Sequence, residues 1–314
     1  MILTVTLNPA VDRTIYLNNF VTGQVNRVVG SRQDAGGKGI NVSKSIRALG
    51  GSSTAFAVLG GQNGEYITHS VASRGIELTN FEISGETRQN IKIVDLSNDQ
   101  YTDINEPGPE IDSGISQKIL DAILSKLQSD TVLVLSGSAA PGIAPDIYRI
   151  LTEEANRRGC SVILDADDRL LAEALKAGPK LVKPNIHELE ALVGKTLATY
   201  PEIIDAAFGI LEQGVGAVVV SMGKDGAIWV DRQQAFHIES MNVTVKSTVG
   251  AGDAMVAALA LGLDTGLNPE ETMRLAAASS AASVKAEGSD SGTIGEILIN
   301  ESKQLTITWL GGKR

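Results

Sequence analysis

The chain has 314 residues, of which 43% are hydrophobic, and its 27 basic and 37 acidic side chains give a formal net charge of −10. This length and apolar content suffice for one large α/β domain or two ordinary ones, and they argue against a largely disordered chain. The acidic balance disfavours nucleic acid and anionic membranes as partners, so an anionic ligand would need a local basic site.

Nothing in the sequence indicates secretion, membrane insertion or a zinc site. The first residues lack the basic start of a signal peptide, and no apolar run approaches the roughly 20 residues that span a bilayer. Cys160 is the only cysteine, which excludes an internal disulfide and favours a cytoplasmic location. It opens an apolar strand, so we interpret it as a core residue. The three histidines are scattered without the spacing of zinc ligands.

The first third of the chain predicts strands of two kinds. Residues 2–7 alternate apolar residues with threonine and end at Asn8 and Pro9, which predicts a strand and a turn. Asp12 follows, and in an open α/β sheet it would lie beyond a strand end, where ligands bind; the alternative is a simple turn aspartate. Residues 14–20 and 25–33 predict irregular strands, which we assign to a small accessory sheet.

A glycine-rich stretch containing Lys38 and Asn41 then leads into a helical run at 44–49. Glycines before a helix allow a ligand to approach the backbone closely. The spacing of a P-loop is absent, and no G-x-G-x-x-G follows a strand, so both common nucleotide fingerprints are missing. Residues 53–59 predict a strand and 64–74 a helix. The alternating residues 90–104, preceded by Arg88, predict a hairpin of the accessory sheet.

From residue 111 onward, strand and helix patterns alternate. The expected helices are 112–128, 145–158, 168–176 and 202–213, and the expected strands are 132–136, 161–165, 181–183 and 217–221. These strands are nearly continuous apolar runs, which is typical of a parallel sheet covered on both faces. A hairpin at 227–238, a strand at 243–246 and helices at 254–263 and from 268 to before Gly288 complete the pattern. A further strand at 305–310 has no assigned role.

Residues 247–253 form a glycine turn between the expected strand at 243–246 and an apolar helix. Such a turn presents the backbone N–H groups of Gly250, Ala251 and Gly252 at a helix N-terminus. Unsatisfied donors and the positive end of the helix dipole attract phosphate there. Asp253 fits two roles on this evidence, a helix cap or a base that accepts a proton from a hydroxyl attacking the phosphate.

Seven motifs carry a family resemblance across residues 1 to about 288: 6–12, 36–43, 87–90, 136–138, 183–189, 221–226 and 248–253. On these motifs the chain resembles the ribokinase-like sugar kinases, most closely the sugar-phosphate branch typified by bacterial 1-phosphofructokinase and tagatose-6-phosphate kinase. The resemblance implies one domain over 1–314, an α/β three-layer sandwich with a mostly parallel central sheet, and a small β-sheet lid formed by about 12–34 and 86–108. It also implies ATP and Mg²⁺ as co-substrates and a homodimer formed through the lid.

The resemblance implies a role for each site residue. Asp253 would be the general base, and the backbone of Gly250, Ala251 and Gly252 an anion hole. The expected substrate contacts are Asp12, Gly37, Lys38, Asn41, Arg88, Asn90 and Ser136, with Arg27 as a further cation. Of these, Lys38 and Arg88 would hold the phosphate already on the sugar. The expected nucleotide contacts are Lys183, Asn185, Ser221, Gly223, Gly226 and Thr248, and Glu188 would position Mg²⁺, through water if not directly.

The expected reaction is the ATP-dependent phosphorylation of D-fructose 1-phosphate at its 6-hydroxyl. The alternatives are a tagatose-6-phosphate kinase, a kinase of an unphosphorylated sugar or nucleoside, and a non-catalytic sugar-phosphate sensor. The chain departs from the family after Asp165, where a small residue and a Ser-Gly-like turn are usual but Asp167 and Asp168 occur here. We interpret these extra carboxylates as caps of the following helix rather than metal ligands. The C-terminal tail also differs from the branch.

Overall fold

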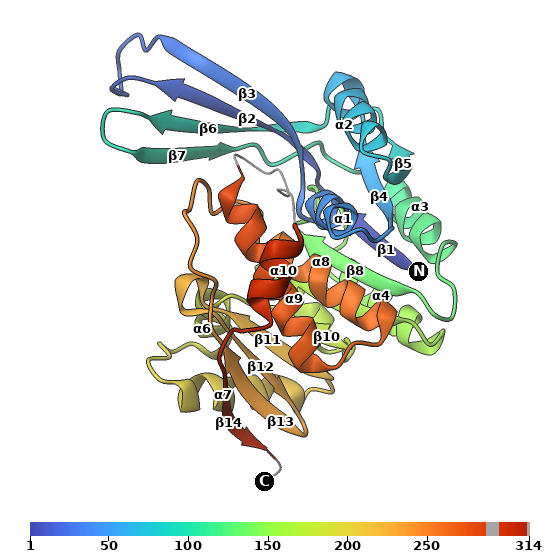
Figure 1. Ribbon diagram of the computed structural model, residues 1–314. Helices are drawn as coiled ribbons and strands as arrows, with labels where there is room; N and C mark the ends of the chain where they lie inside the picture. Colours follow the sequence, from blue (N-terminus) through green and yellow to red (C-terminus); the bar gives the residue numbers. More distant parts are fainter. Residues whose placement is uncertain (287–294, 313–314) are drawn as a thin grey trace.

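The computed structural model describes residues 1–286 and 295–312 and contains a large and a small β-sheet (Figure 1). The large sheet has ten strands, in the spatial order β14 (Ile307–Gly312), β13 (Gln234–Ile238), β12 (Ala227–Asp231), β11 (Ala217–Ser221), β10 (Leu181–Val182), β9 (Ser161–Ala166), β8 (Val132–Gly137), β1 (Ile2–Thr6), β4 (Thr54–Leu59) and β5 (Glu77–Glu82). Pairing is parallel from β11 through β5 and antiparallel from β11 to β14. The predicted mostly parallel α/β sheet is therefore confirmed.

The order of the strands creates a crevice at one end of the large sheet. Strand β1 lies between β4 and β8, so the chain first extends the sheet on one side of β1 and later on the other. Crossovers on the two sides of such a point leave space beyond the carboxyl ends of the strands, where ligands bind in open α/β sheets. Residues following β1, β8, β9, β10 and β11 thus face a common space.

Helices cover both faces of the large sheet (Figure 1). One face carries α1 (Lys38–Ala48), α2 (Gly61–Ser73), α8 (Ala251–Thr265) and α9 (Pro269–Lys285), and the other carries α3 (Ser113–Leu124), α4 (Ile147–Arg157), α5 (Asp168–Leu175) and α7 (Tyr200–Leu211). Two short helices, α6 (Ile186–Val193) and α10 (Glu296–Ser302), complete the set. The β-strands bury apolar side chains on both faces, which accounts for their continuous apolar runs.

Helix α8 is almost entirely buried because it lies between the sheet and two other helices. Its alanine-rich sequence leaves little side-chain volume, so α1 and α9 pack closely against it. At Gly262 a Cβ atom would come within 2.5 Å of the Thr272 side chain of α9, and a larger residue there would separate the two helices. This packing holds the start of α8 rigidly at the end of the sheet.

The small sheet extends away from the body of the molecule (Figure 1). Its strands lie in the order β3 (Val28–Gly36), β2 (Ala10–Leu17), β6 (Arg88–Asp95) and β7 (Gln100–Asn105). The pairing is antiparallel for β2 with β3 and for β6 with β7, and parallel for β2 with β6. Because β2 starts only four residues after β1 ends, the base of this sheet is fixed next to the carboxyl end of the large sheet.

One segment differs from the sequence-based expectations, and two strands without an expected position form the edges of the large sheet. Residues 243–246 form no strand; instead the N–H groups of Lys246 and Ser247 donate to the Val284 carbonyl at the end of α9. Residues 77–82 form β5 at an edge of the large sheet, where polar side chains on one side are tolerated. The strand with no assigned role is β14, which pairs antiparallel with β13 and forms the opposite edge. Among the helices of the described residues, none has the length and apolarity to cross a membrane.

Candidate active site

A cavity of about 890 Å³ lies beyond the carboxyl ends of the parallel strands and under the base of the small sheet. It gathers side chains from segments far apart in the sequence, because every parallel strand from β1 to β11 ends there. Of the predicted site residues, the lining includes Asp12, Gly37, Lys38, Asn41, Arg88, Asn90, Ser136, Lys183, Asn185, Glu188, Ser221, Gly223, Thr248, Gly250, Gly252 and Asp253.

A second cavity of about 570 Å³ adjoins the first and shares Ser221, Gly223, Thr248 and Gly252 with it. Its other walls are mostly apolar, with Met255, Met273 and Ala277 among them. The predicted residues Gly226 and Ala251 line this second cavity rather than the first. A flat, mostly apolar ligand moiety fits such a space, with polar atoms directed toward the shared residues.

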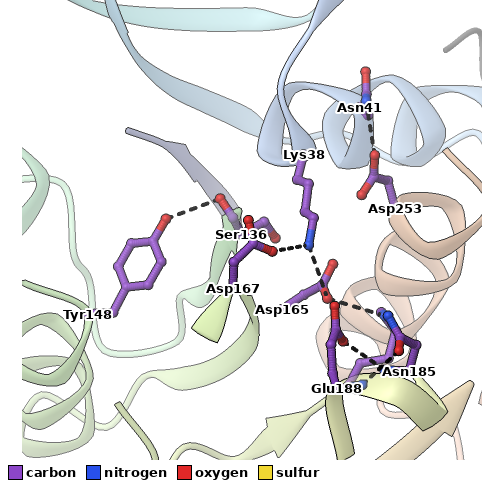
Figure 2. A network of polar contacts seen from close by, with 10 residues as sticks. Lys38, Asn41, Ser136, Tyr148, Asp165, Asp167, Asn185, Glu188 and Asp253 are labelled. Carbon is purple, nitrogen blue, oxygen red and sulfur yellow. Dashed lines mark hydrogen bonds and ion pairs between the residues drawn. The ribbon is translucent and has the colours of Figure 1, made fainter. Parts of the chain in front are cut away.

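Asp253 is the third residue of α8, and its side chain is 8% exposed. The helix N-cap is Gly250, at φ 81°, and no side chain caps this helix end. The Asp253 carboxylate instead accepts a hydrogen bond from Asn41 Nδ2 to its Oδ2 at 2.9 Å (Figure 2). The carboxylate is therefore directed across the cavity toward α1 and does not act as a cap.

Burial raises the pKa of Asp253 to about 6, and the Asp165 carboxylate adds to the rise. The Asn41 hydrogen bond and the Lys38 and Lys183 ammonium groups oppose it. A carboxyl group with such a pKa is ionised at neutral pH and is still a stronger base than an ordinary aspartate. These are the properties that a general base working near neutral pH requires.

The turn before Asp253 presents backbone donors to the same cavity. Gly250 has a left-handed conformation, which glycine adopts without strain, and it turns the chain sharply into α8. The N–H groups of the first turn of a helix have no partner within the helix. A Cβ atom on Gly252 would lie 3.7 Å from Lys183 Nζ, so a buried ammonium group adjoins the turn. Backbone and side chain together attract an anion here.

Lys38, Asp165, Asp167 and Lys183 form an ion-pair network on one wall of the cavity. Figure 2 shows Lys38 between Asp165 and Asp167. Lys38 Nζ lies 2.7 Å from Asp167 Oδ1 and 3.9 Å from Asp165 Oδ1, and Lys183 Nζ lies 3.2 Å from the same Asp165 oxygen. Burial lowers the pKa of Lys38, but the Asp165 and Asp167 carboxylates outweigh it and hold the pKa above its ordinary value. Lys38 is therefore an ammonium ion throughout the neutral range.

The expectation that Asp167 and Asp168 cap the next helix is wrong for Asp167. Asp167 does occupy the N-cap position of α5, yet its side chain makes no capping hydrogen bond and binds Lys38 instead. The opposite charge at 2.7 Å competes successfully with the helix N–H groups for the carboxylate. The side chain of Asp168 lies outside the described residues.

The small sheet contributes Asp12, Asn90 and Arg88 to the lining of the cavity. Asp12 and Asn90 are direct partners in the pairing of β2 with β6, and Asn90 Nδ2 donates to Asp12 Oδ1 at 3.0 Å. Burial raises the pKa of Asp12, although the Asn90 hydrogen bond lowers it.

Arg88 is anchored through Nε and Nη2 to the Asn8 carbonyl, at 3.2 and 3.1 Å, and through Nη1 to the Glu106 carbonyl at 2.9 Å.

Four residues that line the cavity each have a buried side-chain atom without a hydrogen-bond partner: Thr6 Oγ1, Asn8 Oδ1, Asn90 Oδ1 and Ser136 Oγ. Unsatisfied buried polar atoms are uncommon because each loses its hydration without compensation. All four belong to residues of one cavity, which gives that cavity a polar wall suited to a ligand with several hydroxyl or phosphate groups. Thr6 and Asn8 were not predicted as site residues, although both belong to the first recognised motif, at the end of β1.

Asn185 and Glu188 form a capping box at the start of α6. Asn185 Oδ1 accepts from the Glu188 N–H at 2.9 Å, and Glu188 Oε2 accepts from the Asn185 N–H at 2.8 Å. This contact involves one Glu188 oxygen and leaves the other for a water molecule or cation. Within residues 1–286 and 295–312, no three His, Cys, Asp or Glu side chains converge as a metal site.

Arg27, predicted as a further cation for the substrate, is exposed before β3 and does not line either cavity.

The chain matches the family model of pfkB family carbohydrate kinases over residues 5–294. It is 39% identical over 281 residues to a 1-phosphofructokinase of Xanthomonas campestris and 40% identical over 282 residues to one of Rhodobacter capsulatus, each covering 88% of both chains. Its structure is similar to phosphofructokinase-2 of Escherichia coli in complex with substrates and products, with a TM-score of 0.91, 30% identity and coverage of 96% and 99%. A ribokinase of Thermotoga maritima has the same fold, with a TM-score of 0.78, 23% identity and coverage of 97% and 99%.

Proposed function

The chain belongs to the pfkB family of carbohydrate kinases, and from this premise we propose that it transfers the γ-phosphoryl group of ATP to the 6-hydroxyl of D-fructose 1-phosphate. The products are fructose 1,6-bisphosphate and ADP. The observation that carries the proposal is the position of Asp253. Its buried carboxylate, with a pKa of about 6, lies at the helix start whose backbone donors line the same cavity.

In the proposed reaction, the sugar hydroxyl attacks the γ-phosphorus while Asp253 accepts the hydroxyl proton. A bond forms between the sugar oxygen and the γ-phosphorus, and the bond to the oxygen that bridges the β- and γ-phosphates breaks. The N–H groups of Gly250, Ala251 and Gly252 stabilise the charge on the transferring group, which is the main requirement of phosphoryl transfer. Proton transfer to a positioned carboxylate contributes about 10²- to 10⁴-fold in rate.

The other end of the cavity binds the sugar. Asp12 and Asn41 accept and donate hydrogen bonds to the sugar hydroxyls, with Asn90 and Ser136 completing the polar wall. Lys38 and Arg88 supply positive charge for the phosphate already on the substrate, where arginine offers a bidentate contact and lysine a point charge. A neutral sugar or nucleoside needs no such pair of cations, so a phosphorylated sugar is favoured. A sensor without catalysis would not need a buried base at the helix start.

ATP binds with its base and ribose in the second cavity and its phosphates at the residues that both cavities share. Ser221, Gly223 and Thr248 line that boundary, and Lys183 and Asn185 lie beside it. Mg²⁺ usually takes one or two protein carboxylates and completes its shell with water and phosphate oxygens. The free oxygen of Glu188 fits this mode, and Asp165 is another carboxylate that lines the same cavity. The bound ion would neutralise charge on the nucleotide phosphates.

Tagatose 6-phosphate is the principal alternative substrate, and it differs in which end of the ketohexose carries the phosphate. The named 1-phosphofructokinase relatives favour fructose 1-phosphate. The reaction would take place in the cytoplasm, where ATP is available and where the single buried Cys160 stays reduced.

We further propose that two copies associate through the small sheet, which would act as the lid of the cavity. The register places Ile15, Ile91, Ile93 and Ile104 on the face of this sheet that does not carry Asp12. Ile104 is 51% exposed, and the sheet extends beyond the covering helices (Figure 1). Ile15 and Ile91 are half-buried and Ile93 is buried, so contact with a second copy would mainly remove Ile104 and the exposed parts of Ile15 and Ile91 from water.

A kinase assay with a panel of sugar phosphates tests the proposed function. The purified chain is mixed with ATP, Mg²⁺ and either fructose 1-phosphate, fructose 6-phosphate, tagatose 6-phosphate or unphosphorylated fructose, and ADP release is followed. We expect the highest kcat/KM with fructose 1-phosphate. A higher kcat/KM with tagatose 6-phosphate would show that the protein is a tagatose-6-phosphate kinase instead. No turnover of any hexose phosphate would refute the proposal that it is a sugar-phosphate kinase.

A further inference from the structure

Asp167 is a carboxylate of the cavity wall to which the proposed reaction assigns no task. It follows β9 at the start of α5, and its side chain is 44% exposed toward the cavity that it lines. The side chain makes no capping bond with α5, and its Oδ1 accepts a hydrogen bond from Lys38 Nζ at 2.7 Å. The main contact of Asp167 is therefore with the cation proposed to bind a phosphate.

The position of Lys38 is set by its packing. The side-chain stem of Lys38 runs along Gly137 at the end of β8, where a Cβ atom on the glycine would lie 3.5 Å from Lys38 Cβ and Cγ. The ammonium group thus enters the cavity near the ends of β8 and β9. Asp165 is 3.9 Å away and is already engaged by Lys183 at 3.2 Å, which leaves Asp167 as the closer partner.

The charge of the cavity makes this contact consequential. Its described lining includes five carboxylates, Asp12, Asp165, Asp167, Glu188 and Asp253, but only three lysine or arginine side chains. A site that takes two anionic substrates would be expected to have the opposite balance. Lys38 Nζ donates one hydrogen bond, to Asp167, so a phosphate oxygen that binds Lys38 comes close to this carboxylate, and the repulsion between the two negative charges opposes binding.

We propose that Asp167 is a specificity-determining residue that occupies Lys38 in the ligand-free cavity and is displaced by a phosphate oxygen of the substrate. This inference rests on the proposed function, since it takes Lys38 as a phosphate contact. When a lone phosphate or other small anion binds, its contact with Lys38 replaces the contact of Lys38 with Asp167, so the net gain is small and the anion binds weakly. A sugar phosphate or nucleotide displaces the carboxylate because its remaining groups bind elsewhere in the cavity.

Equilibrium binding to Asp167→Asn, measured by titration calorimetry, tests this competition. The amide keeps the size of the side chain but removes its charge, so we expect inorganic phosphate and the ligand that uses Lys38 to bind about 3- to 10-fold more tightly. Fructose 1-phosphate and ATP are titrated separately, and tightening of one alone identifies which phosphate Lys38 contacts. Asp167→Ser serves as a second variant. Asp121→Asn, an exposed site on α3 with the same change in net charge, is the control and should bind as wild type.

The same measurement in a Lys38→Gln background separates competition from a general field effect. If Asp167 acts by occupying Lys38, Asp167→Asn tightens binding much less when Lys38 is absent. Equal tightening in both backgrounds, or unchanged or weaker binding in the single variant, would overturn the proposal. The binding readout does not depend on turnover. An inactive protein that shows the expected tightening would contradict the proposed function and leave the role of Asp167 standing.

Discussion

Asp253 combines two opposing requirements within one side chain. Its burial among apolar residues of α8 removes it from water, which raises its pKa to about 6 and makes it a better base. The same burial makes its ionised form costly to the folded protein. Asn41, Lys38 and Lys183 offset part of that cost, so these neighbours stabilise the ionised form that the proposed role as a base requires.

Replacement of Asp253 by asparagine should lower kcat at least about 100-fold, because the amide cannot accept the hydroxyl proton. The KM for the sugar phosphate should change little, since the amide oxygen can still accept the bond from Asn41. Steady-state kinetics of Asp253→Asn and of Asp264→Asn, an exposed aspartate of the same helix, provide the comparison. Turnover close to wild type in Asp253→Asn would remove Asp253 from the role of base.

The raised pKa of Asp253 also predicts how stability depends on pH. The folded state holds the Asp253 proton more tightly than the unfolded state, whose pKa is near 3.8. Folding therefore loses stability as the pH rises from about 4 through about 6, by up to about 3 kcal/mol at 1.4 kcal/mol per tenfold change in proton affinity. Asp253→Asn cannot ionise and avoids this loss.

Urea unfolding of wild type and Asp253→Asn at pH 5 and pH 8 measures this effect. The free energy of unfolding of the variant should exceed that of wild type at pH 8, and the difference should shrink at pH 5. A difference that is the same at both values would show that the Asp253 pKa is not raised in the folded protein.

The sequence predicts which residues belong to the site better than it predicts which side chains contact one another. Motif positions identified Asp253, Asn41 and Lys38 as residues of one site, because each follows a strand end in family order. The partner of Lys38 was not predicted, since residues 38 and 167 are brought together only by the packing of α1 on β1 and β8, next to the end of β9. The Asn90 to Asp12 hydrogen bond likewise depends on the register of β2 with β6, which spacing does not determine.

At the scale of elements, the small sheet has two proposed tasks. It would cover the substrate site as a lid, and it would form the contact between two copies. Its cavity side carries Asp12 and Asn90, and its other side carries the isoleucine stripe. Alternation of side chains along a strand makes this division possible within a single layer. A change on the isoleucine side can therefore alter assembly with little direct effect on the residues that bind substrate.

Ile104→Lys should weaken the dimer, because a charged side chain would be buried in the interface at the β7 end of the apolar stripe. Analytical ultracentrifugation over a range of protein concentrations compares it with wild type and with Gln117→Lys, an exposed position on α3. We expect a dimer for wild type and Gln117→Lys and a shift toward monomer for Ile104→Lys. A monomeric wild type, or a dimer that Ile104→Lys leaves unchanged, would rule out association through this face.

The turn before α8 shows where element prediction from sequence failed. The alternation of residues 243–246 predicted a strand, yet this segment lies along the end of α9 and donates to Val284 instead. The edge of β13, the strand that precedes this segment in the chain, is already paired with β14, so the segment cannot extend the sheet next to β13. The helix start itself was predicted correctly, because Gly250 and the apolar run that follows depend on local geometry alone.

At the scale of the whole molecule, the order in which the strands and helices follow one another along the chain brings the site residues together. Strands β1, β8, β9, β10 and β11 end at one cavity, and α8 returns late in the chain to place Asp253 beside it. The mostly parallel sheet and the second sheet were predictable because apolar runs and alternating runs differ in sequence. The position of β5 and β14 at the two edges was not, since edge strands lack a distinct pattern.

The most direct test of the central claim is a ³¹P NMR time course of the protein with ATP, Mg²⁺ and fructose 1-phosphate. We predict that the γ-phosphate signal of ATP declines while a second sugar phosphate signal, that of the 6-position, grows in equal amount. The same mixture with Asp253→Asn should change at least about 100-fold more slowly. Hydrolysis of ATP to inorganic phosphate without the new sugar phosphate signal, or no consumption of ATP, would contradict the account.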